Sequence, residues 1–225
     1  MKQMFSNATV MWDERDLVER ESLIAQCVQI VSDEWTGMNR AVRFRRVETP
    51  TLTPASNLAG HIAEGFPMLD TKRGMLRPET TAGCIAAFHS MFPMSNQRAK
   101  NMPYCIWQFG KSYRDEERPD TMRASKLRLV EFHQLEFELF ADAGTRADYI
   151  GKAIHALSGR FGGEILDAAD DLPHYSKRTL DWHINGLEVA GCSERTDWPE
   201  GLIFEVSIGI DRLLAVLGLA SGGAH

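Results

Sequence analysis

The sequence lacks any apolar segment of about 20 residues, the length needed to cross a bilayer. Its opening stretch, MKQMFSNATVMWDERD, has no apolar core of the kind found in a signal peptide. The four cysteines form no CxxC pair, which argues against a zinc site and favours reduced thiols. These absences predict a cytoplasmic protein without a membrane-spanning segment.

Several common catalytic motifs are also missing. The patterns GxxxxGK[ST] and GxSxG do not occur, and the seven histidines do not cluster at metal-ligand spacing. A net charge of −6 argues against a protein that binds nucleic acid over its whole surface, but it is compatible with a local basic patch. There is no repeat or evident linker, and 225 residues that are 44% hydrophobic predict one domain over residues 1–225.

Hydrophobic periodicity predicts the main elements. Helices are expected over residues 13–35, 81–92 and 145–161, and from about residue 210. Strands are expected over residues 42–47, on both sides of a long loop at 117–126, and over 202–206. Residues 181–190 predict either one strand or two short strands separated by a tight turn at Asn185-Gly186. Residues 55–73 are expected to form a loop. Strands joined by turns rather than crossover helices favour an α+β fold, with an antiparallel sheet flanked by helices.

The stretch Cys105–Phe140 has the densest polar pattern. From Val130 onward, apolar residues alternate with glutamate and glutamine. A period of two places four side chains on one face of the strand: Phe132, Gln134, Glu136 and Glu138. Because this face holds a ring and several acids, it needs cations, hydrogen-bond donors or a ligand.

Three arginines lie at the ends of predicted elements: Arg114, Arg128 and Arg212. For each arginine taken alone, an ordinary surface charge is the favoured interpretation. Together on one sheet face they would form a polyphosphate clamp, because the planar guanidinium binds phosphate oxygens in pairs. Such a clamp also stabilises charge that develops during phosphoryl or nucleotidyl transfer.

Other candidates carry two interpretations each. Phe132 is either ordinary core packing or a stacking platform for a base. Glu116 either accepts a hydrogen bond from an adenine amino group or pairs with Arg118. Glu188 and Glu205 either bind Mg²⁺ or a cationic amine, or form salt bridges. Ser207 is also a candidate helix N-cap.

The segments that contain these residues resemble the sequence motifs of a known family. YRDE (Tyr113–Glu116) followed by RLVEF (Arg128–Phe132) resembles motif 2 of the class II aminoacyl-tRNA synthetases, and GIDRLL (Gly209–Leu214) resembles motif 3. The long helix and the strand ending at Pro50 resemble motif 1, the dimer interface of that class. Further segments resemble the homodimeric glycyl-tRNA synthetases: LRPET (Leu76–Thr80), EFHQLEFELF (Glu131–Phe140), GLEVAGCSERTDW (Gly186–Trp198) and FEVSIGIDR (Phe204–Arg212).

The resemblance implies a homodimer that uses ATP and Mg²⁺ to activate glycine as glycyl-adenylate. The glycyl group would then pass to a tRNA, a carrier protein or another amine. Arg114 and Arg212 are the implied catalytic residues, with Arg114 on the α-phosphate and the carboxylate of glycine. Arg128 and Arg212 would hold the outer phosphates and the adenine face. Glu116 would bind the adenine amino group, and Phe132 would stack on its ring.

The resemblance also implies roles for the remaining candidates. Glu188 would help to hold ATP and its magnesium ion. Glu136, Glu205 and Ser207 would surround the amino group of glycine, with Arg195 nearby. Glycine offers no side chain to bind, so its pocket must hold the ammonium with acids and exclude a Cβ sterically.

The sequence departs from this family in four places, one of which is that the family's glycine- and tyrosine-rich opening segment is not evident before residue 13. Val130 stands where motif 2 usually has a second arginine, and Val206 replaces a proline. The sequence ends soon after motif 3, so we expect no anticodon-binding domain within it. Two other hypotheses therefore stay open: a catalytically inactive synthetase-like binding or regulatory subunit, and an enzyme that activates alanine or serine.

Overall fold

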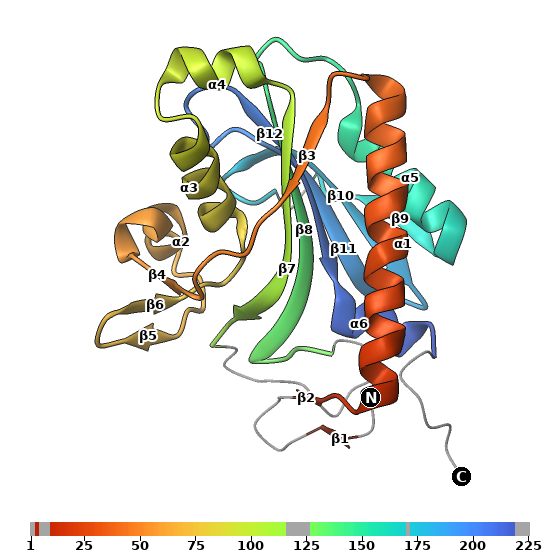
Figure 1. Cartoon of the computed structure of the whole chain (residues 1–225). Helices are drawn as coiled ribbons and strands as arrows, with labels where there is room; N and C mark the ends of the chain where they lie inside the picture. The colour runs from red at the N-terminus through yellow and green to blue at the C-terminus, as the bar shows by residue number, and fades with distance from the viewer. Residues whose placement is uncertain (1–2, 5–9, 116–126, 170–171, 219–225) are drawn as a thin grey trace.

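The computed structural model describes residues 3–4, 10–115, 127–169 and 172–218. Its main sheet has seven strands: β3 (Arg43–Arg46), β7 (Tyr104–Tyr113), β8 (Glu131–Ala141), β9 (Glu164–Asp167), β10 (Ser176–Ile184), β11 (Leu187–Arg195) and β12 (Leu202–Gly209). Their order across the sheet is β3-β7-β8-β12-β11-β10-β9 (Figure 1). Only the β3–β7 pair within this sheet is parallel. The predicted α+β fold with a mainly antiparallel sheet is confirmed.

Helices and short strands surround this sheet. The helices are α1 (Glu14–Met38), α2 (Ala59–Ala63), α3 (Thr81–Met91), α4 (Ser95–Asn101), α5 (Tyr149–Phe161) and α6 (Ile210–Val216), with a 3₁₀ turn η1 (Ala55–Leu58). The short strands are β1 (Gln3–Met4), β2 (Val10–Met11), β4 (Leu52–Thr53), β5 (Asp70–Thr71) and β6 (Gly74–Leu76). Among the described residues, no helix combines the length and the apolar character needed to span a membrane.

Helices α1 and α5 cover one face of the sheet and form the main core (Figure 1). Helix α1 begins at a capping box, in which Asp13 and Asp16 each bind the other's backbone N–H. Near its other end, the indole N–H of the buried Trp35 donates to the carbonyl oxygen of Tyr149 at 2.9 Å. This bond and the apolar stripe of α1 fix the two helices to each other and to the sheet.

The opposite face is only partly covered, by α3. There Phe88 of α3 stacks on Phe140 of β8 with ring centroids 4.1 Å apart. Residues at every second position before Phe140 share this face, as the period of two in the sequence predicts. Because α3 packs over Phe140, the polar residues earlier on β8 remain available to line a cavity.

The segment over residues 55–73 is not simply a loop, so this prediction is wrong in part. It contains η1, α2 and the short strand β5. Helix α2 has five residues, too few to show a helical period in the sequence. Helix α4 and strand β9 are likewise short elements that the periodicity does not indicate.

The predicted break at Asn185-Gly186 is confirmed. These two residues form the turn between β10 and β11, with φ values of 53° and 77°. Positive φ at both central residues is typical of the two-residue hairpin turn that an Asn-Gly pair favours. The hairpin matters for the site because both strands contribute to its wall.

Candidate active site

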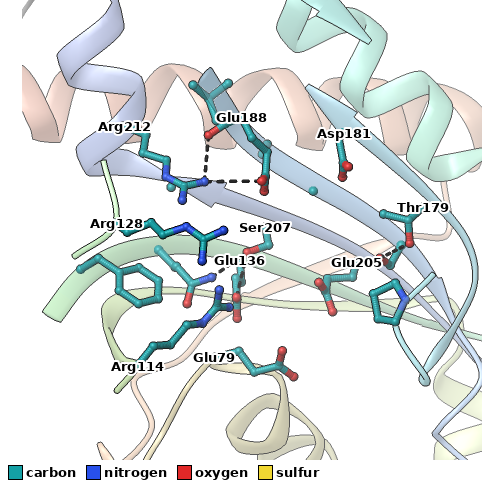
Figure 2. Close-up of a pocket in the computed structure, with 18 of the residues that line it drawn as sticks. Glu79, Arg114, Arg128, Glu136, Thr179, Asp181, Glu188, Glu205, Ser207 and Arg212 are labelled. Carbon is teal, nitrogen blue, oxygen red and sulfur yellow. Dashed lines mark hydrogen bonds and ion pairs between the residues drawn. The ribbon is translucent and has the colours of Figure 1, made fainter. Parts of the chain in front are cut away.

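A cavity of about 260 Å³ lies on the sheet face that α3 leaves open. Strands β8, β10, β11 and β12 contribute residues to it, together with the segment after α2 and the start of α6. Figure 2 shows labelled side chains from the four strands and from the start of α6 converging on it. Its charged and polar lining includes Glu79, Arg114, Arg128, Gln134, Glu136, Asp181, Glu188, Glu205, Ser207 and Arg212.

One end of the cavity is cationic. Arg114, Arg128 and Arg212 reach into it from three separate segments (Figure 2), as the sequence predicts. The Arg114 guanidinium carbon lies 5.2 Å from the ring centroid of Phe132. Arg212 donates to the carbonyl oxygen of Glu188 at 3.0 Å, and its Nη1 lies 3.6 Å from the Glu188 carboxylate. These three arginines could hold a polyphosphate beside an aromatic ring.

The other end is acidic. Glu136 accepts hydrogen bonds from the backbone N–H of Thr80 at 2.8 Å and from the Ser207 hydroxyl at 2.9 Å. Gln134 donates to the oxygen of Ser207 at 3.0 Å. Ser207 therefore orients Glu136 inside the cavity, and α6 has Gly209 rather than Ser207 as its N-cap. Glu205 lies on the same face of the neighbouring strand β12.

Arg195 lies behind this acidic end and is absent from the described residues that line the cavity. It is buried, and its guanidinium pairs with Glu79 at 3.0 Å, with Asp197 at 2.8 Å, and with Glu205. The guanidinium carbon also lies 3.8 Å from the ring centroid of Tyr175. Arg195 thus holds two pocket carboxylates in place from outside the cavity.

Burial and neighbouring charges together set the pKa values of these acids. It raises the pKa of Glu205 to about 7, although the nearby Arg195 opposes the shift. Burial and the charge of Glu79 also raise the pKa of Glu136. Burial acts on Glu79 in the same direction, but Arg195 and His61 outweigh it and hold the pKa of Glu79 well below its ordinary value. At neutral pH, Glu79 is therefore the fixed anion and Glu205 is close to its titration point.

The described residues contain no group of three His, Cys, Asp or Glu side chains arranged for a metal ion. The Glu188 side chain is half exposed and already lies near Arg212. Magnesium in nucleotide sites is usually held by one or two carboxylates together with phosphate oxygens and water. Glu188 fits such a site as a single protein ligand beside a polyphosphate.

The cavity brings most of the predicted residues together. Arg114, Arg128, Phe132, Glu136, Glu188, Glu205, Ser207 and Arg212 all line it. The predicted Glu116 lies outside the described residues. Sequence reasoning missed Glu79, Gln134 and Asp181 as lining residues. Gln134 could have been found, because it lies between Phe132 and Glu136 on the predicted polar face.

Comparisons with known proteins agree with this geometry. Residues 68–179 match the family model "tRNA synthetase class II core domain (G, H, P, S and T)". The chain is 32% identical over 145 residues to a glycine–tRNA ligase of Deinococcus radiodurans. This alignment covers 57% of this chain and 27% of that enzyme. It is 43% identical over 72 residues to a glycine–tRNA ligase of Thermococcus sibiricus, in an alignment that covers 32% of this chain and 11% of that enzyme. The chain therefore spans a minor part of the length of these relatives.

Solved structures show the same fold at lower identity. A pyrrolysyl-tRNA synthetase of Desulfitobacterium hafniense matches 93% of this chain and 72% of its own, with a TM-score of 0.59 and 20% identity. A threonyl-tRNA synthetase structure from Cryptosporidium parvum matches 97% of this chain and 68% of its own, with a TM-score of 0.65 and 13% identity. At these identities the likeness concerns the fold alone.

Proposed function

The chain has a class II tRNA synthetase core, and from that premise we propose that it uses ATP to activate glycine as glycyl-adenylate. The glycyl group then passes to tRNA or to another acceptor. The charge polarity of the cavity is the observation that carries this proposal. Three arginines lie at one end, with Phe132 beside Arg114, and Glu79, Glu136 and Glu205 lie at the other.

This polarity matches the two substrates. ATP brings a polyphosphate and a base, whereas glycine brings an ammonium group and a carboxylate. A site that binds both must place its cations on the phosphates and its acids on the ammonium. The carboxylate of glycine then lies between the two ends, next to the α-phosphate. The distant identity to glycine–tRNA ligases supports glycine as the amino acid.

In the proposed reaction, a carboxylate oxygen of glycine attacks the α-phosphorus of ATP. A new P–O bond forms, the bond to the β-phosphate oxygen breaks, and pyrophosphate leaves with the bonding electrons. Arg114 holds the α-phosphate and stabilises the charge of the transition state. Arg128 and Arg212 hold the outer phosphates and the adenine, and Phe132 stacks on the base. Most of the acceleration comes from positioning and preorganised charge.

The acidic end holds the amino group. Glu136 and Glu205 accept its N–H donors, and Ser207 keeps Glu136 in place. Arg195 holds Glu79 and Glu205 from behind the cavity. A magnesium ion held by Glu188 and the phosphates would supply further positive charge near the leaving group.

The cytoplasm is the compartment that we propose, because all four cysteines are free thiols. A homodimer built through α1 and β3 is part of the same proposal. The acceptor stays open between tRNA, a carrier protein and another amine.

The test is pyrophosphate exchange into ATP with each of the twenty amino acids. We expect exchange that depends on glycine and falls at least a hundredfold in Arg114→Ala, since removing one donor to developing charge costs roughly 10²–10³ in rate. Arg160→Ala is the matched control, because Arg160 lies on α5 and bonds Gln26 away from the cavity. No exchange from a folded protein that binds ATP would favour the binding-subunit hypothesis. Exchange with alanine or serine instead would reassign the substrate.

A further inference from the structure

The Arg114 side chain is held in an unusual way. Its guanidinium carbon lies 5.0 Å from the ring centroid of Phe66 and 5.2 Å from that of Phe132. Its Nε donates to the carbonyl oxygen of Pro78 at 3.4 Å. The two rings come from different elements, since Phe132 lies on β8 and Phe66 follows α2. The guanidinium is therefore in contact with two aromatic rings that approach it from separate parts of the chain.

This arrangement suits an arginine that must bind a phosphate. A ring face attracts the guanidinium through its quadrupole and restricts the orientation of its plane. Unlike a carboxylate, a ring does not neutralise the charge or occupy the N–H donors at the edge of the fork. Two rings can thus position Arg114 and leave its outer donors available to phosphate oxygens.

Phe66 is itself fixed in place. It belongs to a segment, residues 55–67, that we call the strap. The backbone N–H of Phe66 donates to the carbonyl oxygen of His61 at 3.0 Å, and the two rings meet edge to face with centroids 5.1 Å apart. The carbonyl oxygen of Pro67 accepts a bond from the N–H of Asp115 at 3.1 Å. The strap is therefore bonded directly to the residue that follows Arg114.

The strap is anchored at its other side as well. The His61 ring packs edge to face on His174, with centroids 5.5 Å apart, and the His174 Nδ1 lies 2.6 Å from the Glu64 carboxylate. A Cβ at Gly60 would lie 2.5 Å from the His174 Nε2, so the His174 ring packs closely against the backbone of α2 and would have to shift to admit a side chain there. These contacts, together with that of the His61 ring with Tyr175, hold the strap, and with it the ring of Phe66, against His174 and Tyr175.

We propose that Phe66 is a positioning residue for Arg114, a role that rests on the proposed activation of glycine. Phe66 itself need not touch the reacting atoms. Its ring holds the guanidinium between the strap and β8, so that the donors of Arg114 meet the α-phosphate as charge develops. The second ring face of Phe132 then remains available for the base.

The variant Phe66→Leu tests this role, because leucine keeps apolar volume and removes the ring. In pyrophosphate exchange we expect kcat to fall roughly tenfold to a hundredfold, as expected for a misplaced catalytic group, with a smaller change in the KM for ATP. Phe66→Tyr keeps the ring and should restore kcat to within about threefold of the unaltered protein. Phe161→Leu is the matched control, because Phe161 also lies beside an arginine, Arg160, at 5.8 Å and lines no part of the cavity.

A second readout does not depend on activity. In ¹⁵N spectra of the ligand-free protein, the Arg114 Nε–H signal can be assigned by its loss in Arg114→Lys. We expect this group to be rigid on the picosecond-to-nanosecond timescale in the unaltered protein and in Phe66→Tyr, and mobile in Phe66→Leu. Phe66→Met replaces the leucine variant if that variant does not fold.

The outcomes separate the two proposals. An unaltered protein without exchange would refute the proposed function, and the mobility of Arg114 would still decide the role of Phe66. Unchanged kcat and unchanged mobility in Phe66→Leu would overturn the role. A fall in kcat in Phe66→Tyr as large as that in Phe66→Leu would also overturn the proposed role of Phe66.

Discussion

Glu205 is a buried carboxyl group of the cavity with a pKa close to neutral pH. It pairs with Arg195, and its neighbours Glu79 and Glu136 add negative charge nearby. Because burial raises its pKa to about 7, the group loses its proton only near neutral pH. The ammonium group of glycine stays protonated throughout this range, so the proposed contact gains charge complementarity as pH rises.

We therefore expect kcat/KM for glycine in the exchange reaction to rise between pH 6 and pH 8. The sign follows from the raised pKa of Glu205, since the anion that binds the ammonium accumulates above about 7. Glu205→Gln should remove most of this rise and lower kcat/KM at pH 8 by about tenfold to a hundredfold, the value of one hydrogen bond to a charged group.

Glu164→Gln is the control, because Glu164 is exposed on the edge strand β9. It should leave both the rate and its pH profile unchanged. An identical pH profile in Glu205→Gln and the unaltered protein would assign the titration to another group.

Side chains on regular strands are easier to predict from the sequence than side chains placed by tertiary contacts. The period of two alone puts Phe132 and Glu136 on one face of β8, where both line the cavity. Glu79 precedes α3 and in the sequence is an acid suited to a helix start, whereas the structure pairs it with Arg195 across the fold. The family resemblance implies that Arg195 lies near the amino group of glycine, and the structure places it behind the acidic end of the cavity. No local pattern indicates that a charged side chain on a strand lies fully buried.

Among the elements, the hairpin of β10 and β11 is predicted from two residues alone. Asn185 and Gly186 both adopt positive φ, and glycine reaches this region without steric cost. The short elements α2, α4 and β9 are not predicted. Helix α2 is too short to be stable by itself, so its position depends on tertiary contacts such as those of His61 with Tyr175 and His174.

A glycine-to-alanine pair tests the turn. Gly186→Ala should lower the free energy of unfolding by about 1–2 kcal/mol, the cost of a Cβ in the left-handed region. Gly159→Ala on the exposed side of α5 should raise it by up to about 1 kcal/mol, since alanine favours the helix. Urea unfolding followed by circular dichroism measures both. An increase in the free energy of unfolding in Gly186→Ala as large as that in Gly159→Ala would show that the positive φ at Gly186 carries no cost.

At the scale of the molecule, one face of the sheet forms the core and the other carries the cavity. Helices α1 and α5 bury one face in the main core, and α3 covers only part of the other, where the cavity lies. The sequence predicts only a sheet flanked by helices, because hydrophobic periodicity identifies buried faces without showing which helices cover them. Whether residues 1–225 form a single domain stays a prediction.

The proposed homodimer also belongs to this scale. Helix α1 exposes Leu17 at 39% and Val18 at 66% of their surface, and β3 is an edge strand of the main sheet. Exposed apolar side chains on a helix and an unpaired sheet edge are each features of a pairing surface. We expect sedimentation at micromolar concentration to show a dimer. Val18→Lys should weaken it roughly tenfold or more, because a lysine buried in an interface loses hydration without a partner.

Leu166→Lys is the matched control for this substitution. Leu166 is 46% exposed on β9, at the opposite edge of the sheet from β3. A lysine there should leave the dimer unchanged if α1 and β3 form the interface. A dimer weakened by Leu166→Lys and not by Val18→Lys would move the interface to the β9 edge. A monomeric unaltered protein at these concentrations would refute the dimer, and the cavity residues of one chain would then have to suffice for catalysis.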